Sequence, residues 1–332
     1  MSTRNIWYVL GLVLVLTVAV GGCQAAGPEA TAAPTPVLVM LDWFPNTNHS
    51  GLYVALDKGW YAEQGLDVQI IEPAEGSTLA QVVAAGQADF GVSYQEEVSY
   101  ARAEELPIVS VAAVIQHNTS GFASPANRGI TRPKDLEGKR YGSWGSPIEK
   151  AVLDALMTCD GGDVENVEFI DVGFADFFTI VQRDVDFAWI FYGWTGMEAE
   201  LRGVPLNVIM LNDWDQCVPD YYTPVLITSE QNIAEKPDLV RKFMEATARG
   251  YEFAIQSPGD AAEVLLKYAP ESNPELVRAS QEWLSPRYQA DAPSWGEQKL
   301  EIWETYADWM ADLELLPRHI EAEKAFTNEF LP

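Results

Sequence analysis

The sequence predicts an α/β protein of two lobes, with mainly parallel sheets, two crossovers between the lobes and a helical C-terminal segment. Short apolar runs rich in β-branched residues alternate with stretches of helical periodicity from about residue 37 to residue 229. From residue 235 onward the periodicity is helical. Repeated β-α-β order with nearly continuous apolar strands is typical of parallel sheets that helices cover on both faces.

In the first part of the chain the expected elements alternate regularly. Strands are predicted at 37–41, 67–71, 90–92 and 108–115, and helices at 51–64, 79–85 and 95–105. Gly65 and Gly86 directly follow two of these helices, which is a common position for a C-terminal glycine. These elements form the first unit of the predicted fold.

Prolines and glycines in 121–135 interrupt this order, and a second unit begins at 136–143. Its helices are predicted at 148–157, 175–182 and 195–202, and its strands at 167–172, 187–191 and 207–211. A strand within 221–229 is expected to return to the first unit. We therefore assign 37–124 and 223–332 to lobe 1 and 125–222 to lobe 2, the plan of hinged binding proteins. Two tandem domains are the alternative, but the helical tail has no sheet of its own.

The N-terminus is expected to be a targeting segment. Arg4 is the only charge before an apolar run at 6–20, and Gly21-Gly22-Cys23 then places small residues before a cysteine. This pattern resembles a bacterial lipoprotein signal, with 1–22 removed and lipid on Cys23. An uncleaved membrane anchor is the alternative, although the run is short for a span of ~20 apolar residues. The Ala, Pro, Thr and Gly content of 23–36 predicts a flexible tether.

Composition argues against several classes of partner. The chain has 21 basic and 49 acidic residues, which disfavours nucleic acid and an anionic membrane surface. A highly charged anionic ligand is also disfavoured, because no local basic cluster is visible. Cys159 and Cys217 are expected to be free thiols, although a disulfide stays open because sequence cannot measure their separation. No histidine or cysteine spacing indicates a metal site.

Polar and aromatic residues follow several predicted strands, where open α/β folds bind ligands. Flat rings at strand ends favour a ring-shaped ligand held by stacking, and the amide, acid and hydroxyl groups beside them suit hydrogen bonding. The glycines in the turn at 141–147 would let backbone N–H groups approach a ligand. The candidate ligand-binding residues are Asp42, Trp43, Asn46, Asn48, His49, Tyr94, Gln95, Glu96, Trp144, Gly145, Ser146, Trp189, Tyr192, Trp194 and Glu198.

Each of these candidates also has a structural interpretation. Large aromatic side chains fill cores, and Asn46 and Asn48 are suited to capping the following helix. Asp42 is expected either to face the ligand or to brace the turn. Glu96 lies in the first turn of a predicted helix, where acidic residues complement the helix dipole.

The order of several motifs resembles the extracytoplasmic solute-binding proteins that are related to the thiamine-pyrimidine synthases of fungi. The resemblance covers the chain from about residue 37 to the C-terminus and implies a type II periplasmic-binding-protein-like fold. It rests on Leu41-Asp42-Trp43-Phe44-Pro45-Asn46-Thr47-Asn48-His49, Lys58-Gly59-Trp60-Tyr61, Gly86-Gln87-Ala88-Asp89-Phe90-Gly91-Val92 and Phe326-Thr327-Asn328-Glu329-Phe330.

The resemblance also implies a function. It predicts a monomeric receptor without a cofactor, lipid-anchored on the extracytoplasmic face of the cell membrane, that delivers its ligand to the permease and ATPase subunits of an ABC importer. Known ligands of the family include riboflavin and a formylated aminopyrimidine derived from thiamine. The 11 tryptophans favour the larger ring of riboflavin, and the formylaminopyrimidine is the alternative.

An enzyme is the less favoured alternative. The fungal synthases use their own histidine together with pyridoxal phosphate, iron and a cysteine-rich cluster. His49 matches the position of that histidine, but only Cys217 stands where the cysteine run would be. We therefore expect no catalysis.

Overall fold

The computed structural model describes residues 33–73, 78–173 and 175–332. Residues Pro34–Pro332 form one compact unit with two five-stranded sheets. The proposed signal segment, the lipidation site at Cys23 and nearly all of the tether lie outside the described residues. Among the described residues, no helix has both the length and the apolar character needed to span a membrane.

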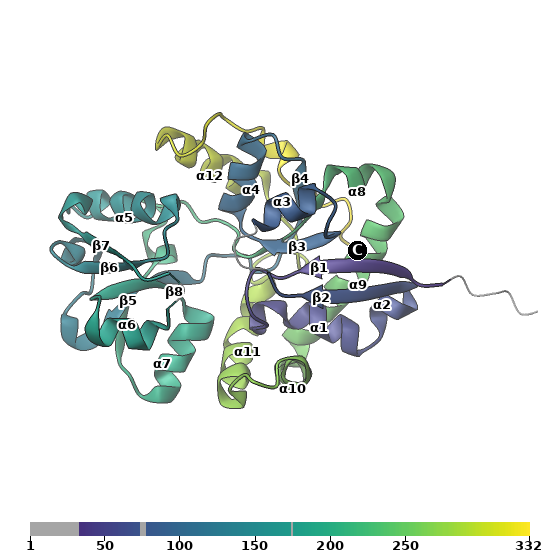
Figure 1. The fold of residues 1–332 in the computed structure, drawn as a ribbon, viewed down its shortest axis with the longest axis horizontal. Coiled ribbons are helices and arrows are strands. Elements are labelled where there is room, and N and C mark those ends of the chain that lie inside the picture. Colours follow the sequence, from purple (N-terminus) through teal and green to yellow (C-terminus); the bar gives the residue numbers. More distant parts are fainter. Residues whose placement is uncertain (1–32, 74–77, 174) are drawn as a thin grey trace, which may run out of the picture. The chain divides into compact units, whose positions relative to one another are not determined.

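The first sheet has the strand order β2-β1-β3-β10-β4. β1 pairs in parallel with β2 and β3, whereas β10 is antiparallel to both β3 and β4. The chain forms β5 to β9 in the second sheet and then returns to the first sheet as β10 (Figure 1). The strands are β1 (Thr35–Met40), β2 (Leu66–Ile71), β3 (Phe90–Ser93), β4 (Ile108–Ala113) and β10 (Val225–Ser229).

Helices cover both faces of the first sheet. Residues of α1, α2, α9, α10 and α11 share one buried apolar cluster with the strands, and residues of α3, α4 and α12 share another. The bounds are α1 (Ser50–Asp57), α2 (Trp60–Glu63), α3 (Leu79–Ala84), α4 (Gln95–Ala103), α8 (Glu230–Glu235), α9 (Pro237–Gln256), α10 (Pro258–Tyr268), α11 (Pro274–Gln289) and α12 (Leu300–Asp312). Short 3₁₀ turns are η1 (Thr47–His49) and η7 (Ala322–Lys324).

The contact between α1 and α9 depends on two glycines. A Cβ on Gly250 would lie 2.0 Å from the carbonyl oxygen of Gly51, and a Cβ on Gly51 would lie 2.3 Å from the ring of Tyr251. Any larger side chain would therefore separate the two helices. This close contact holds α1 directly behind the turn that follows β1.

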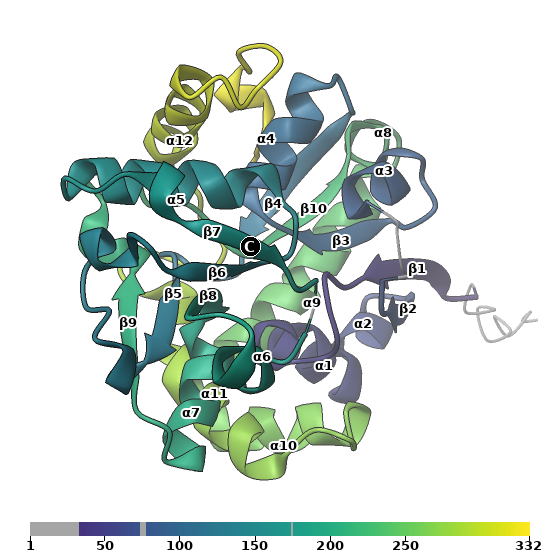
Figure 2. The same ribbon diagram turned by 60° about the vertical axis from the view of Figure 1, so that its left-hand side comes forward.

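The second sheet has the order β7-β6-β8-β5-β9, with α5 on one face and α6 and α7 on the other (Figures 1 and 2). Its strands are β5 (Ser120–Pro125), β6 (Arg140–Ser143), β7 (Glu168–Asp171), β8 (Phe187–Phe191) and β9 (Leu206–Met210). Its helices are α5 (Pro147–Cys159), α6 (Phe177–Arg183) and α7 (Met197–Arg202). The π-helical turn η5 (Tyr192–Gly196) follows β8, and the 3₁₀ turns are η2 (Ala126–Arg128), η3 (Pro133–Leu136), η4 (Val164–Asn166) and η6 (Leu211–Trp214).

The two-lobed α/β fold predicted from the sequence is confirmed, with two differences. Both sheets are mixed rather than mainly parallel, because β10 and β5 run antiparallel to their neighbours. The segment up to residue 124 was also expected in lobe 1, but β5 pairs with β8 and β9 in the second sheet. Serine and glycine in Ser120–Pro125 give this buried strand a weak apolar pattern.

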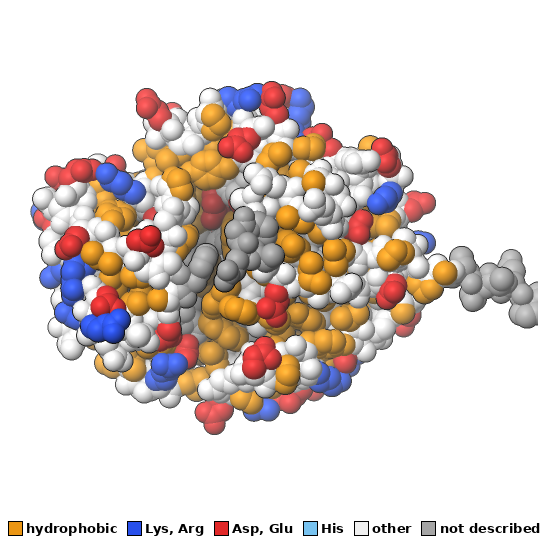
Figure 3. Space-filling view, in the orientation of Figure 1, with side chains coloured by type: hydrophobic (Ala, Val, Ile, Leu, Met, Phe, Trp, Pro, Cys, Tyr) orange, Lys and Arg blue, Asp and Glu red, His pale blue; other side chains and the backbone are white. Residues whose placement is uncertain are grey.

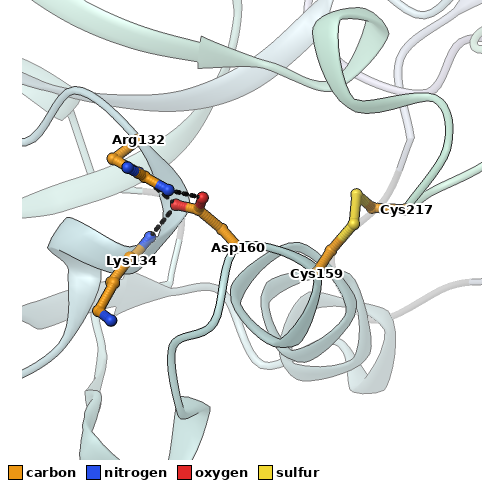
Figure 4. Close-up of a disulfide and its surroundings, with 5 residues drawn as sticks. All are labelled: Arg132, Lys134, Cys159, Asp160 and Cys217. Atoms are coloured by element: carbon orange, nitrogen blue, oxygen red, sulfur yellow. Dashed lines mark hydrogen bonds and ion pairs between the residues drawn. A yellow bond between two sulfur atoms is a disulfide. The ribbon is translucent and has the colours of Figure 1, made fainter.

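The expectation of free thiols is wrong. Cys159 at the end of α5 and Cys217 after η6 form a disulfide, with Cα atoms 5.9 Å apart (Figure 4). Beside it, Asp160 accepts a hydrogen bond of 2.9 Å from the backbone N–H of Lys134 and an ion pair from Arg132. The sequence separation of 58 residues concealed a spatial proximity that only the fold creates.

Candidate functional site

The turn after β1 contains a buried hydrogen-bond network. The Nε2 atom of His49 lies 2.6 Å from Asp42 Oδ1, and the Tyr94 hydroxyl donates to Asp42 Oδ2 at 2.7 Å. The other ring nitrogen of His49, Nδ1, accepts from the backbone N–H of Asn46 at 3.2 Å. Both histidine nitrogens are thus occupied, and the side chain is fully buried.

The pKa values of two members of this network are shifted in opposite directions. Burial acts to raise the pKa of Asp42, but the neighbouring His49 and the hydrogen bonds from His49 and Tyr94 outweigh it and lower this pKa. Burial, followed by the charge of Asp42, raises the pKa of Tyr94 well above its ordinary value. Asp42 therefore braces the turn, which was one of its two expected roles. His49 also acts here as a brace.

The asparagines of this turn act differently from each other. Asn46 caps η1: its Oδ1 accepts from the backbone N–H of Asn48 at 2.9 Å, and its Nδ2 donates to Phe44 O at 3.0 Å. The capping interpretation therefore describes Asn46. The backbone carbonyl of Asn48 accepts from the Tyr251 hydroxyl at 2.7 Å.

Trp43 and Phe44 lie on the exposed side of the same turn. Their side chains are 42% and 62% exposed, and their ring centroids are 5.8 Å apart. Large aromatic rings with this exposure are unusual beside a rigid buried network, and a flat ligand would find a stacking surface here.

β3 leads into α4, which positions Tyr94, Gln95 and Glu96. Gln95 is fully buried, and its Oε1 accepts from the backbone N–H of Tyr222 at 2.8 Å. This bond joins the start of α4 to the segment that leads from η6 back to β10, so Gln95 has a structural role. Glu96 differs, because its Oε2 atom is buried and has no hydrogen-bond partner.

Other buried polar groups also lack a hydrogen-bond partner, and two of them, on Tyr100 and Tyr306, lie close enough to Glu96 for its charge to raise their pKa values. The hydroxyls of Tyr100 and Tyr306 and the Nδ2 atom of Asn118 are also buried without partners. Tyr306 on α12 stacks on Tyr221 with centroids 4.3 Å apart. Because an unpaired buried polar group costs about 1–3 kcal/mol, such a concentration indicates a place where polar groups are held for a ligand.

This cluster has unusual acid-base properties. Burial raises the pKa of Glu96 to about 8; a hydrogen bond with its own backbone opposes the rise, and the neighbouring Glu97 carboxylate adds to it. Burial and then the charge of Glu96 raise the pKa of Tyr100 and Tyr221. At neutral pH, Glu96 is therefore mostly a neutral carboxylic acid that can both donate and accept a hydrogen bond.

In lobe 2, Trp144 directly follows β6 and forms an aromatic wall with Trp189, the middle residue of β8. Their ring centroids are 5.4 Å apart, and Trp189 also packs against Phe122 at 5.1 Å. Both tryptophans are half-buried. The indole Nε1 of Trp189 is a buried donor without a partner. The surface is hollowed between the two lobes in the space-filling view (Figure 3).

The turn at Trp144, Gly145 and Ser146 does not offer its backbone N–H groups to a ligand, contrary to expectation. The N–H groups of Trp144 and Ser146 donate to the Glu149 carboxylate at 3.2 and 2.7 Å. The N–H of Gly145 donates to Ser143 Oγ at 3.0 Å. The positive end of α5 is thus already neutralised by a side chain of its own first turn.

Tyr192, Trp194 and Glu198 lie beyond the end of β8. The Tyr192 ring is 5.3 Å from that of Trp283 on α11, so this contact joins the two lobes. Trp194 packs against the apolar core of lobe 1, and Glu198 pairs with Arg202 on the same helix. A surface hollow of about 480 Å³ is lined by Tyr192 and by residues of α7 and β9.

The structure therefore divides the candidates into groups. Trp43, Tyr94 and Glu96 gather at the strand ends of lobe 1. In lobe 2, Trp144 after β6 packs against Trp189 within β8. Asn46, His49 and Gln95 support the backbone, and Glu198 belongs to an ion pair on α7. Sequence reasoning did not include Tyr100, Asn118 or Tyr306 among the candidate residues. The helical i, i+4 spacing of Glu96 and Tyr100 was a usable signal, whereas nothing in the sequence connects Tyr306 to them.

The described residues include no group of three or more His, Cys, Asp or Glu side chains arranged to hold a metal ion. Cys217 is joined to Cys159, and both nitrogens of His49 are engaged. These residues do not fit the iron and cysteine cluster of the synthases.

A family model described as NMT1/THI5 like matches residues 46–261. The formylaminopyrimidine-binding protein of Halalkalibacterium halodurans is 32% identical over 92% of this chain and 94% of its own length. The 4-amino-5-hydroxymethyl-2-methylpyrimidine phosphate synthase of Legionella pneumophila subsp. pneumophila is 24% identical over 89% of this chain and 92% of its own. The riboflavin-binding protein RibY of Chloroflexus aurantiacus is 27% identical over 97% of both chains.

Comparison with solved structures supports the same fold. The periplasmic aliphatic sulphonate binding protein SsuA of Escherichia coli superimposes with a TM-score of 0.70 at 14% identity, covering 88% of this chain and 92% of that one. The type II periplasmic-binding-protein fold expected from the sequence is therefore confirmed.

Proposed function

Because the chain belongs to the NMT1/THI5-like family, we propose that it is the solute-binding component of an ABC importer and that its ligand is a formylated aminopyrimidine. The similarity to the formylaminopyrimidine-binding protein is higher than that to the riboflavin-binding protein, at 32% against 27% identity. This proposal replaces riboflavin, which the tryptophan content favoured, with the alternative weighed beside it.

The observation that carries the ligand assignment is the carboxyl of Glu96, whose Oε2 atom is buried without a hydrogen-bond partner. An aminopyrimidine has a ring nitrogen that accepts a hydrogen bond beside an amino group that donates one. A protonated carboxyl matches this edge, since its O–H donates to the ring nitrogen and its second oxygen accepts from the amino group. The pKa of about 8 keeps Glu96 in this form at neutral pH.

The aromatic residues supply the remaining recognition. Trp144 and Trp189 in lobe 2 and Trp43 in lobe 1 offer ring faces from both lobes. Contacts from both lobes favour a closed state over an open one, so ligand binding is expected to bring the lobes together. The buried hydroxyl of Tyr100, which has no partner, is available for the formyl oxygen.

We propose that the protein binds this pyrimidine without transforming it. The histidine that matches the reactive histidine of the synthases has both nitrogens engaged in the fold. The cysteine at the position of their cluster is joined in a disulfide. Incubation with pyridoxal phosphate and iron should leave the mass of the protein unchanged, and loss of mass at His49 would contradict this proposal.

The anchoring predicted from Gly21-Gly22-Cys23 also belongs to this proposal. It places the receptor on the extracytoplasmic face of the cell membrane, where it would meet the permease. Cys23→Ser should release the protein from membranes or leave its precursor unprocessed. Mass spectrometry that finds an unmodified Cys23 in mature, membrane-bound protein would contradict the lipid anchor.

Calorimetry tests the ligand. Purified protein, unfolded and refolded to remove any bound molecule, should bind the formylaminopyrimidine at least about tenfold more tightly than riboflavin. Glu96→Ala should weaken pyrimidine binding, because it removes both the donor for the ring nitrogen and the acceptor for the amino group. Exposed Glu104→Ala, at the end of the same helix, is the matched control and should bind as the wild type does.

Two outcomes would contradict the assignment. Tight binding of riboflavin with quenched flavin fluorescence, together with no pyrimidine binding, would return the assignment to riboflavin. Equal affinity of the wild-type and Glu96→Ala proteins for the pyrimidine would remove Glu96 from the site.

A further inference from the structure

Glu149 is a buried carboxylate at the first turn of α5, with 1% of its surface exposed. It accepts four hydrogen bonds. Oε2 accepts from the Tyr141 hydroxyl at 2.7 Å and from the Trp144 backbone N–H at 3.2 Å. Oε1 accepts from the Ser146 backbone N–H at 2.7 Å and from the Ser143 hydroxyl at 3.1 Å.

These bonds use the donors that the strand-to-helix turn would otherwise offer to a ligand. The N–H groups from Trp144 to Ser146 all donate within the turn, two of them to Glu149 and one to Ser143 Oγ. In many α/β folds, such N–H groups at a helix N-terminus bind a phosphate or another oxyanion. Here two carboxylate oxygens and one hydroxyl take the place of that anion.

The turn lies beside the aromatic wall and borders open space. Trp144, whose N–H is held by Glu149, packs against Trp189 at 5.4 Å. Gly145 is exposed and has a φ of +94°, and a Cβ built on it meets nothing within 4 Å. An anionic group on a ligand stacked at this wall would find no free backbone N–H group in the turn at 144–146. It would instead approach the carboxylate of Glu149.

We infer that Glu149 is a specificity-determining residue that makes lobe 2 reject anionic ligands, including phosphorylated pyrimidines, and accept uncharged ones. The inference rests on the proposed function for the identity of the uncharged ligand, but not for the rejection of anions. Two effects act together: the carboxylate occupies the donors, and its charge repels a second anion in a partly desolvated site.

Removal of the carboxylate tests this inference without the pyrimidine. Glu149→Ala leaves the four hydrogen-bond donors of Glu149 without an acceptor, and added inorganic phosphate should supply one. Thermal unfolding and calorimetry with phosphate, at ionic strength matched by sodium chloride, should show phosphate binding to Glu149→Ala at least about tenfold tighter than to the wild type. Glu149→Gln removes the charge but keeps the volume, so its gain should be intermediate.

Asp176→Ala is the matched control. Asp176 also caps a helix of lobe 2, with Oδ1 accepting from the Thr179 N–H at 3.0 Å and from its hydroxyl at 2.7 Å, but it is exposed. Phosphate should not stabilise this variant beyond the wild type. Should Glu149→Ala fail to fold even in phosphate, Glu149→Gln provides the same measurement.

A folded Glu149→Ala or Glu149→Gln protein whose phosphate response equals that of Asp176→Ala would overturn the inference and leave Glu149 as a helix cap alone. A second arm compares a phosphorylated aminopyrimidine with its unphosphorylated form. If phosphate alone binds the alanine variant but neither pyrimidine does, the ligand assignment fails and the rejection of anions stands.

Discussion

The raised pKa of Glu96 predicts that the protein becomes less stable as the pH rises from about 4.5 to about 8. In this range the folded protein holds a proton on Glu96 that the unfolded chain has released, because the pKa is about 8 in the folded state and 4.5 ordinarily. The state that binds more protons is favoured at lower pH. The stabilisation is therefore present at acid pH and is lost as the pH rises through the folded-state pKa.

The magnitude follows from the same two values. At about 1.4 kcal/mol per pH unit, a rise from 4.5 to about 8 corresponds to at most about 5 kcal/mol in the free energy of unfolding. This is a large part of the ~5–15 kcal/mol that stabilises a typical domain. Glu96→Gln, a neutral replacement of similar shape, has no such dependence. It should match the wild type near pH 5 and exceed it by several kcal/mol near pH 9.

Chemical denaturation of both proteins at pH 5, 7 and 9 measures this difference. Subtracting the two free energies removes the titration of all other groups. Glu104→Gln serves as the control, because this exposed side chain at the end of α4 should give a constant difference. A constant difference for Glu96→Gln as well would refute the neutral carboxyl, and with it the hydrogen-bonding scheme for the pyrimidine.

Further predictions address other parts of the molecule. Trp144→Ala should weaken ligand binding by about 1–3 kcal/mol in calorimetry without loss of folding, and unchanged affinity would remove the ring from the site. Replacing both Cys159 and Cys217 by serine should lower the free energy of unfolding by about 2–4 kcal/mol in denaturant titration, since the disulfide closes a loop of 58 residues; equal stability would contradict this. His117 bonds Asp220 at 2.6 Å and Asp291 at 2.8 Å, and the bond to Asp220, opposed by burial and aided by Asp291, raises its pKa to about 9. This stabilisation is fully present below pH 6.5 and is lost as the pH rises through 9. Because the His117 side chain is 41% exposed, we expect a contribution of only about 1 kcal/mol to the free energy of unfolding. The measurement is the stability difference between wild type and His117→Asn at pH 6 and at pH 10, and the same difference at both pH values would contradict the prediction.

The alternation of apolar and helical segments predicted the fold because each lobe buries its strands between helices, and burial on both faces leaves a continuous apolar pattern. β5 was not predicted because its residues do not form a continuous apolar pattern. Most of Ser120–Pro125 is buried, yet Phe122 stands among small and polar residues in this sequence. Backbone pairing with β8 and β9, rather than burial of large apolar side chains, therefore defines the strand. The disulfide likewise depends on a distance that only the folded chain defines.

The candidate site was predictable where it is local and unpredictable where it is not. The turn after β1 contains Asp42 and His49 within a few residues, so sequence identified both, although not which of them braces the other. Tyr306 reaches Glu96 from a helix more than two hundred positions away, and no local pattern indicates that approach. Glu149 was visible as the fourth residue of a Ser-x-x-Glu capping pattern, which predicts that the turn uses its own donors.

The choice of riboflavin depended on the number of tryptophans, and their positions in the fold weaken that argument. Trp295 and Trp303 are almost fully buried, and Trp295 stacks on Tyr251 at 4.2 Å. Trp60 packs against Phe253, and Trp283 lies under the guanidinium of Arg287 at 3.5 Å. These rings stabilise the helical layer of lobe 1, so they give no information about the size of the ligand. The proposed ligand has a single pyrimidine ring, and Trp43, Trp144 and Trp189 are the tryptophans that we propose to contact it.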